Sequence, residues 1–155
     1  MKVYDCTLYH DEDLILDLRF NILSKFVDKF IICESTFSHS GRKKKLNFNI
    51  NKFPNFKDKI IYIVSDDEPE GLIFDTNPKD KKELPEHYRH NAIKRISHQR
   101  NKLIKGLDLA DAEDFILYSD NDEFPNLDNF NFKAFNKKYV IFEQKLFYYK
   151  LNLYI

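Results

Sequence analysis

The chain has 155 residues, the length of one domain, and its 43% hydrophobic and 15% aromatic content is typical of a globular protein rather than a disordered one. Its 25 basic and 25 acidic residues balance to a net charge of zero, which argues against a nucleic-acid partner attracted by overall charge. No apolar run approaches the roughly 18 residues of a transmembrane helix, and no basic-then-apolar signal sequence begins the chain. We therefore expect a cytoplasmic protein without a transmembrane segment.

The cysteines and the turn-forming residues both favour a simple organisation. Cys6 and Cys33 lie in apolar segments, with no second Cys or His at metal-ligand spacing, and are predicted to be buried core residues without a disulfide. Three glycines and five prolines leave little sequence for flexible linkers. We expect one domain over residues 1–155.

The first part of the chain predicts a strand, a helix and a second strand. Residues 2–8 are rich in β-formers, and the acidic residues 11–13 are expected to begin a helix. Helical spacing predicts that the buried face of this helix consists of Leu14, Ile15, Leu18, Ile22, Leu23 and Phe26. The other face is then formed largely by Asp17, Arg19, Asn21 and Lys25. Residues 30–33 form a second apolar run, which we expect to be a strand.

The same alternation continues to residue 118. Residues 60–64 and 115–118 predict two more strands, with a polar loop or lid over residues 66–86 and a helix over residues 87–107 between them. Alternating strands and helices predict an α/β fold in which helices flank a mostly parallel sheet. In such sheets ligands bind beyond the carboxyl ends of the strands. One crevice is therefore expected to be lined by the polar residues just past those ends: Asp5, Glu34, Asp66, Asp67, Asp120 and Asp122.

The pattern changes after residue 125. Residues 139–142 and 145–155 predict two additional strands in a mixed or antiparallel arrangement. The second is apolar and ends the chain, so we expect a short gene product or a missing second half. An unpaired edge of this kind can also join two copies of the chain into a homo-oligomer.

The most informative stretch is residues 115–125, in which an uncharged strand runs into Asp120-Asn121-Asp122. Two carboxylates at the end of a buried strand need a positive partner, and Mg²⁺ or Mn²⁺ bridging to a diphosphate is a suitable one. A Ca²⁺ loop of the EF-hand type is disfavoured, since Phe124 and Pro125 stand where it needs an oxygen ligand and a glycine. The alternative is a solvated acidic turn.

Two basic features are candidates for holding an anion. Gln99-Arg100-Asn101 is expected to open a helical stretch that Gly106-Leu107 ends, which would place Arg100 beside backbone N–H groups and opposite Asp120. The basic run at residues 41–45 includes Lys44 and is interpreted as a clamp for phosphate or an anionic acceptor. The alternatives are a surface ion pair for Arg100 and a solvated loop for the run.

Three further residues are candidates for binding or proton transfer. Glu34, at a predicted strand end, is interpreted as an acceptor of hydrogen bonds from a ribose or a uracil, with a structural role as the alternative. Glu143 is nominated as the catalytic base. His39 is a lone histidine whose candidate roles are ligand or base.

Together these motifs resemble glycosyltransferase family 17 from residue 3 to about residue 150. Tyr4-Asp5-Cys6, Asp11-Glu12 and Asp17-Leu18-Arg19 are similar to the family's Y-D-C, N-E and E-x-R, with Asp11 and Asp17 as departures. Residues 30–34 resemble its second strand with a terminal glutamate, residues 56–61 its approach to the third strand, and residues 99–101 its Q-R-N. Gly41, Lys44, Leu46 and Phe48 match its G-K-P-K-P-L-x-F segment, although the prolines are lysines here. The most specific match is residues 119–125, which are similar to S-D-x-D-E-I-P.

The resemblance implies a GT-A-like nucleotide-sugar fold and a Mn²⁺ or Mg²⁺ cofactor. It also implies inverting transfer, with a UDP-sugar such as UDP-N-acetylglucosamine as donor and a glycan or glycolipid as acceptor. Asp122 is then expected to bind the metal, and Asp120 the ribose or the metal through water. Asp5, Glu34, Lys44 and Arg100 are the other expected donor-binding residues. Family members are longer, so the C-terminal acceptor portion is expected to be short or missing.

Two other functions are left open. A non-catalytic nucleotide-sugar-binding module, or the donor-binding half of a larger complex, is consistent with the apolar C-terminal segment. A nucleotidyltransferase also uses a metal and carboxylates, but it usually has a glycine-rich phosphate loop, and a chain with three glycines has none.

Overall fold

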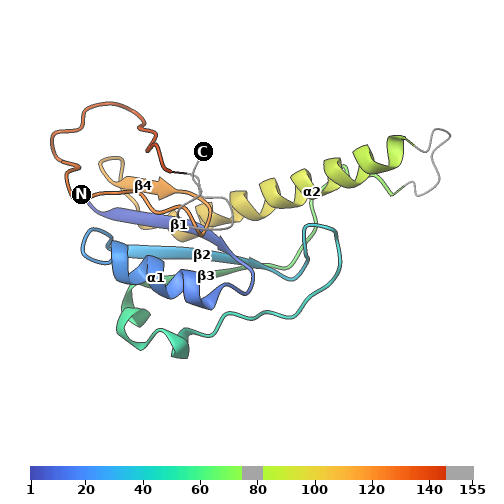
Figure 1. Cartoon of the computed structure of the whole chain (residues 1–155), viewed down its shortest axis with the longest axis horizontal. Helices are drawn as coiled ribbons and strands as arrows, with labels where there is room; N and C mark the ends of the chain where they lie inside the picture. Colours follow the sequence, from blue (N-terminus) through green and yellow to red (C-terminus); the bar gives the residue numbers. More distant parts are fainter. Residues whose placement is uncertain (75–81, 146–155) are drawn as a thin grey trace.

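The computed structural model describes residues 1–74 and 82–145, which form a four-stranded parallel sheet with a helix on each face (Figure 1). The strands β1 (Val3–Tyr9), β2 (Lys29–Ser35), β3 (Ile60–Ser65) and β4 (Phe115–Tyr118) lie in the order β3-β2-β1-β4. The helices are α1 (Asp13–Leu23) and α2 (Glu83–Lys102). The 3₁₀ segments η1 (Ile50–Lys52) and η2 (Pro54–Lys59) precede β3, and η3 (Leu103–Leu107) follows α2. The predicted α/β class and parallel sheet are confirmed.

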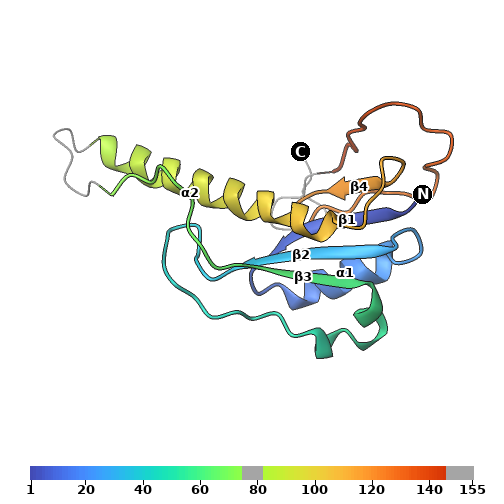
Figure 2. The ribbon, with the colours of Figure 1, turned by 180° about the vertical axis from the view of Figure 1, so that it is seen from behind.

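The core has two layers because neighbouring residues of a strand point to opposite faces of the sheet. On one face, Phe20 of α1 packs in a cluster with Phe30 and Ile32 of β2. On the other face, Ile31 of β2 packs with Leu103 of η3. Figures 1 and 2, which view the molecule from opposite sides, show α1 in front of the sheet in the first and α2 in the second. Strand β2 is therefore covered on both faces, which explains its continuous apolar run.

Both cysteines are buried and free, as predicted. Burial raises the pKa of the Cys6 and Cys33 thiols to about 12 in each case. The thiols therefore stay protonated at neutral pH and act as small apolar core groups.

The buried face of α1 differs from the predicted one. Leu14, Leu18 and Ile22 are exposed, whereas the buried positions are Leu16, Arg19, Phe20 and Leu23. The prediction fails at Arg19, which is 0% exposed because Asp5 of β1 forms an ion pair with it inside the domain. A periodicity analysis that assumes every arginine is exposed therefore predicts the wrong buried face for this helix.

The C-terminal part also differs. Residues 139–142, predicted as a strand, pair with none of the described strands, and the side chains of Tyr139 and Ile141 are largely exposed. An extended segment needs a hydrogen-bonding neighbour to become a strand, and these residues have none in the described part of the chain. Except for Lys145, the segment predicted at 145–155 lies outside the described residues, as does the homo-oligomer edge expected there.

Helix α2 begins at Glu83, earlier than predicted, and its first turns extend beyond the sheet (Figure 1). The polar stretch before it is irregular over residues 66–74, and residues 75–81 lie outside the described part. Among the described residues, no helix combines the length and apolarity that crossing a membrane requires.

Gly106 of η3 provides a test of how closely this helical segment packs on β2. A Cβ added at Gly106 would lie 2.5 Å from Cγ2 of Ile31. We expect Gly106→Ala to lower the free energy of unfolding by about 1–3 kcal/mol, because overpacking forces its neighbours to shift. Urea denaturation measures this, with the exposed Lys105→Ala as control, expected to change stability by less than about 0.5 kcal/mol. Equal midpoints for the two variants would contradict the close packing.

Candidate functional site

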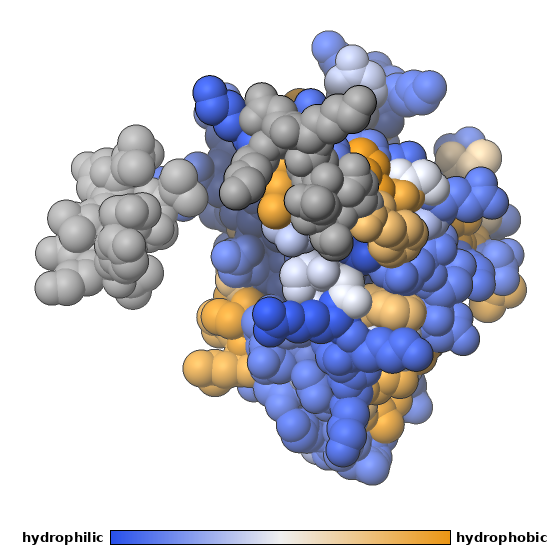
Figure 3. All heavy atoms as spheres, turned by 90° about the vertical axis from the view of Figure 1, so that its right-hand side faces the viewer, coloured by the Kyte–Doolittle hydropathy of each residue, from blue (hydrophilic) through white to orange (hydrophobic). Residues whose placement is uncertain are grey.

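The carboxyl ends of the four parallel strands meet at one edge of the sheet, on the right in Figure 1. Polar residues follow each strand there, including His10 after β1, Asp66 after β3 and Asp120 after β4. Figure 3 views the molecule from this side and shows mostly hydrophilic side chains with separate hydrophobic patches. This edge is the place where ligands bind in open parallel sheets.

The loop after β4, residues 119–123, is built around the buried Arg19 of α1. The Nη1 group of Arg19 donates to the carbonyl oxygens of Asp120 at 3.0 Å, Asn121 at 3.3 Å and Glu123 at 2.9 Å. Its Nη2 group donates to Oγ of Ser119 at 2.7 Å. One guanidinium therefore fixes the backbone of the Asp-x-Asp motif from beneath.

Asp5 neutralises this arginine. Its two carboxylate oxygens accept from Nε and Nη2 of Arg19, each at 2.7 Å. Asp5 is 1% exposed and lies within β1, so the prediction that it follows the end of the strand is wrong. With both oxygens bound to Arg19, Asp5 supports the loop from inside the domain rather than facing the crevice.

The loop also closes on itself. Oγ of Ser119 donates to the carbonyl of Glu123 at 3.0 Å, and the N–H of Glu123 donates to the carbonyl of Asp120 at 3.1 Å. The N–H of Asp120 in turn donates to the Glu123 carboxylate at 3.1 Å. These bonds form a tight turn that holds Asp120 and Asp122 at the edge of the sheet.

Arg100 faces Asp120, as the sequence predicts. Its Nη2 lies 2.8 Å from Oδ1 of Asp120, and its guanidinium lies 5.5 Å from the centre of the Tyr118 ring. Arg100 is near the end of α2, so the prediction that residues 99–101 open a helix is wrong, and the backbone N–H groups of a helix start are not beside it. Both side chains are about half exposed, so the pair itself adds little stability and Arg100 is free to meet an anion.

Asp120 and Asp122 offer a suitable pair of ligands for a hard cation. Asp122 is exposed, and its carboxylate has no hydrogen bond or ion pair within residues 1–74 and 82–145. In the same residues no group of three or more His, Cys, Asp or Glu side chains could hold a metal. A cation bound by these two aspartates would therefore take its other oxygen ligands from water and from a phosphate ligand, as Mg²⁺ commonly does. The atoms Nε of Arg100 and Oδ1 and Nδ2 of Asn121 are buried beside them and have no hydrogen-bond partner among the described residues.

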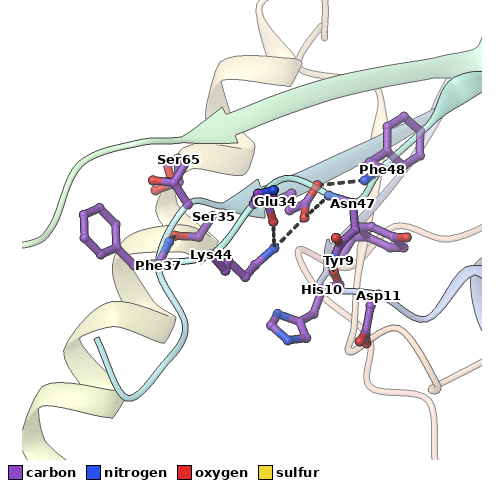
Figure 4. Close-up of polar contacts among 12 residues, drawn as sticks. Tyr9, His10, Asp11, Glu34, Ser35, Phe37, Lys44, Asn47, Phe48 and Ser65 are labelled. Atoms are coloured by element: carbon purple, nitrogen blue, oxygen red, sulfur yellow. Dashed lines mark hydrogen bonds and ion pairs between the residues drawn. The ribbon is translucent and has the colours of Figure 1, made fainter. Parts of the chain in front are cut away.

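Glu34 and Lys44 meet each other rather than an open crevice (Figure 4). Glu34 is 0% exposed and accepts hydrogen bonds from Lys44, from the N–H groups of Asn47 and Phe48 at 2.8 and 3.1 Å, and from the Tyr62 hydroxyl at 2.8 Å. Burial alone would raise the pKa of Glu34, but these donors outweigh it and hold the pKa below its ordinary value. The structural role left open by the sequence is the one that this geometry favours.

The two candidate bases lie in different places. Desolvation, together with the nearby His10 and Arg100, lowers the pKa of His39, so its imidazole is neutral at pH 7 and can accept a proton. A cavity of about 1450 Å³ beside β4 is lined by residues that include Asp120, Asp122, Phe142 and Gln144. Glu143 is exposed and is not among the lining residues. Its neighbours Phe142 and Gln144 do line the cavity, and within the described part of the chain no hydrogen bond or ion pair joins Glu143 to the two aspartates.

Sequence reasoning missed Arg19 and Ser119 as parts of this site. The available signal was one acidic residue inside an apolar strand and one basic residue within the next helix, since buried charges occur in pairs. Periodicity alone treats the two residues separately and cannot show that they meet.

The pH dependence of stability tests the Glu34 network. Because folding lowers the pKa of Glu34 below 4.5, its contribution is present above that value and is lost as the pH falls through the lower folded pKa. We expect Glu34→Gln to lower the free energy of unfolding by about 3 kcal/mol at pH 7, since removing one partner strands the buried charge of the other. The difference from wild type should shrink as the pH falls below 4.5. Urea denaturation over this pH range measures it, with the exposed Glu113→Gln as control; a constant difference would contradict the role of Glu34.

Comparison with known proteins agrees with the motif at the end of β4. The model of glycosyltransferase family 17 matches residues 1–152. Similar curated proteins are the β-1,4-mannosyl-glycoprotein 4-β-N-acetylglucosaminyltransferases of Homo sapiens and Rattus norvegicus, each 36% identical, and of Mus musculus, 35% identical, over 66 residues. These matches cover 40% of the chain and 12% of each relative, so the chain spans only a small part of their length. No solved structure matches. Since the family model covers almost every residue, the chain belongs to glycosyltransferase family 17.

Proposed function

We propose that this protein is a glycosyltransferase whose donor is a UDP-sugar, such as UDP-N-acetylglucosamine, bound through Mn²⁺ or Mg²⁺ at Asp120 and Asp122. The acceptor is a hydroxyl of a glycan or glycolipid, and transfer inverts the configuration of the sugar. The observation that carries the proposal is the loop held by Arg19, because it presents one aspartate paired with Arg100 and one unpaired aspartate at the carboxyl edge of the sheet. Membership of family 17 supports it.

The residues of the chain divide the chemistry between them. A bound divalent cation supplies Lewis-acid stabilisation of the charge on the leaving diphosphate. Arg100, 2.8 Å from Asp120, is placed to exchange that partner for a phosphate oxygen. Removing the proton from the acceptor hydroxyl requires a base, a contribution of roughly 10²–10⁴-fold. The charges of Arg100 and Asp120 both act on the His39 imidazole. Glu143 does not line the cavity beside Asp120, which favours His39 for this step.

The second candidate is a donor-binding half that needs a further chain to complete the acceptor site. It is favoured by Glu143, the sequence-nominated base, which does not line the cavity that Asp120 and Asp122 line. The two functions differ in turnover. A transferase releases UDP from UDP-N-acetylglucosamine when an acceptor glycan is added, whereas a donor-binding half binds UDP and releases none.

Calorimetric titration of UDP tests the donor site. We expect binding in Mn²⁺ that disappears in EDTA. Asp122→Ala should weaken binding in Mn²⁺ by about tenfold or more, since even outer-shell partners of metal ligands contribute 10–100-fold. The exposed position of Asp122 predicts a melting temperature close to that of wild type.

The matched control is Glu113→Ala, which removes another exposed carboxylate of the same cavity, at the opposite end of β4. It should leave UDP binding unchanged. If Asp122→Ala binds UDP in Mn²⁺ as tightly as Glu113→Ala does, the metal assignment is overturned. If the wild-type chain binds UDP in neither condition, the donor-site proposal fails altogether.

A further inference from the structure

We propose that Arg19 is a positioning residue of the donor site, which holds the loop over residues 119–123 in the shape that binds a metal–diphosphate group. The proposal rests on the proposed function, because it takes Asp120 and Asp122 as the groups that bind the donor. Arg19 itself is 0% exposed, so a ligand bound at the surface cannot reach its guanidinium. Its effect reaches the donor only through the backbone of the loop.

The hydrogen bonds of Arg19 show what it fixes. Nε and Nη2 of Arg19 bind Asp5 of β1. Nη2 also binds Ser119, and Nη1 binds the carbonyls of residues 120, 121 and 123 after β4. Its guanidinium has no hydrogen bond to its own helix among the described residues. The side chain therefore joins the loop to the neighbouring strand rather than stabilising α1. Thr7 of β1 adds a second tie, because its Oγ1 donates to the carbonyl of Ser119 at 3.2 Å.

A lysine cannot make the same set of contacts. The planar guanidinium has five N–H donors in a fixed fork, so it binds a carboxylate along one edge and carbonyl oxygens along another. An ammonium has three donors around a single atom. Binding Asp5 would leave it too few donors for Ser119 and the three carbonyls of the loop.

The direction of the carbonyl groups determines what the outer side of the loop presents. In a trans peptide, the N–H of each residue points away from the preceding carbonyl. Since the carbonyls of Asp120, Asn121 and Glu123 point at Arg19, the N–H groups of Asn121, Asp122 and Phe124 point away from it. In the described part of the chain none of these three N–H groups has a hydrogen-bond partner.

The loop thus has two kinds of group on the side away from Arg19. The Asp120 and Asp122 carboxylates suit a cation, and the unpaired N–H groups suit phosphate oxygens, as in anion-binding loops generally. A metal-bound diphosphate carries both charges. Arg19 imposes this arrangement through groups of the protein alone, because its acceptors are Asp5, Ser119 and the three loop carbonyls.

The test compares Arg19→Lys with Leu23→Ala, which removes a buried apolar side chain from the same helix and none of the hydrogen bonds of residues 119–123. We expect both variants to melt at lower temperature than wild type. Only Arg19→Lys should bind UDP in Mn²⁺ about tenfold or more weakly, the size of effect expected of a residue that orients ligating groups. In the ligand-free proteins, hydrogen exchange by mass spectrometry should speed up at residues 117–125 in Arg19→Lys and remain as in wild type in Leu23→Ala.

The proposal is overturned if the two variants show the same UDP affinity and the same exchange at residues 117–125. If Arg19→Lys does not fold, Ser119→Ala replaces it, because it keeps the Asp5 pair and removes only the hydroxyl between Arg19 and Glu123. Ser119→Ala should weaken UDP binding severalfold with a melting temperature near that of wild type, and unchanged affinity would overturn the proposal. Failure of the wild-type chain to bind UDP would instead refute the proposed function, and the exchange of residues 117–125 would still decide whether Arg19 holds the loop.

Discussion

A full positive charge lies inside this domain, and the sheet, the first helix and the loop after β4 are arranged around it. Burying the charge of an arginine is strongly unfavourable in free energy unless a negative charge and further hydrogen-bond acceptors replace its hydration. Here Asp5 of β1 supplies the charge, and Ser119 with three loop carbonyls supplies the remaining acceptors. The presence of an aspartate inside a strand, of an arginine on the buried face of a helix and of a tight turn after β4 therefore has one common cause.

Strand β2 shows the complementary solution with the opposite charge. Glu34 is a buried anion, and it gathers Lys44 and two backbone N–H groups of the segment that crosses the carboxyl edge. The buried cation thus orders a loop through its carbonyl groups, and the buried anion orders another through its N–H groups. The two loops follow β4 and β2, with β1 between them, so both sides of the crevice are fixed from within the protein. Asp5 and Glu34 are both buried and bound to protein donors, so neither presents its carboxylate to a ligand, although their place in the sequence suggests binding residues.

The sequence is informative wherever one residue type implies one environment. Runs of apolar and β-forming residues identify all four strands, and the pair Asp120 and Asp122 marks the site because no charge precedes it within β4. Prediction from the sequence fails where two residues far apart in the chain change each other's environment. Arg19 is buried because of Asp5, and no periodicity within α1 contains that information. The strand predicted at residues 139–142 is wrong for a related reason. These residues are β-forming, but they have no strand to pair with in the described part of the chain.

The buried pair also explains how a weakly stabilised surface site can be well defined. The contact between Arg100 and Asp120 is half exposed, and such pairs contribute about 0–1 kcal/mol. It cannot hold two mutually repelling carboxylates in place. The order of the site must come from the backbone beneath them, where solvent is absent and Arg19 makes bonds to charged and dipolar groups that water does not weaken. A ligand that meets a loop already ordered in this way loses less of its binding free energy to restricting the protein. The affinity of a site of this kind therefore depends on the residues below the carboxylates as much as on the carboxylates themselves.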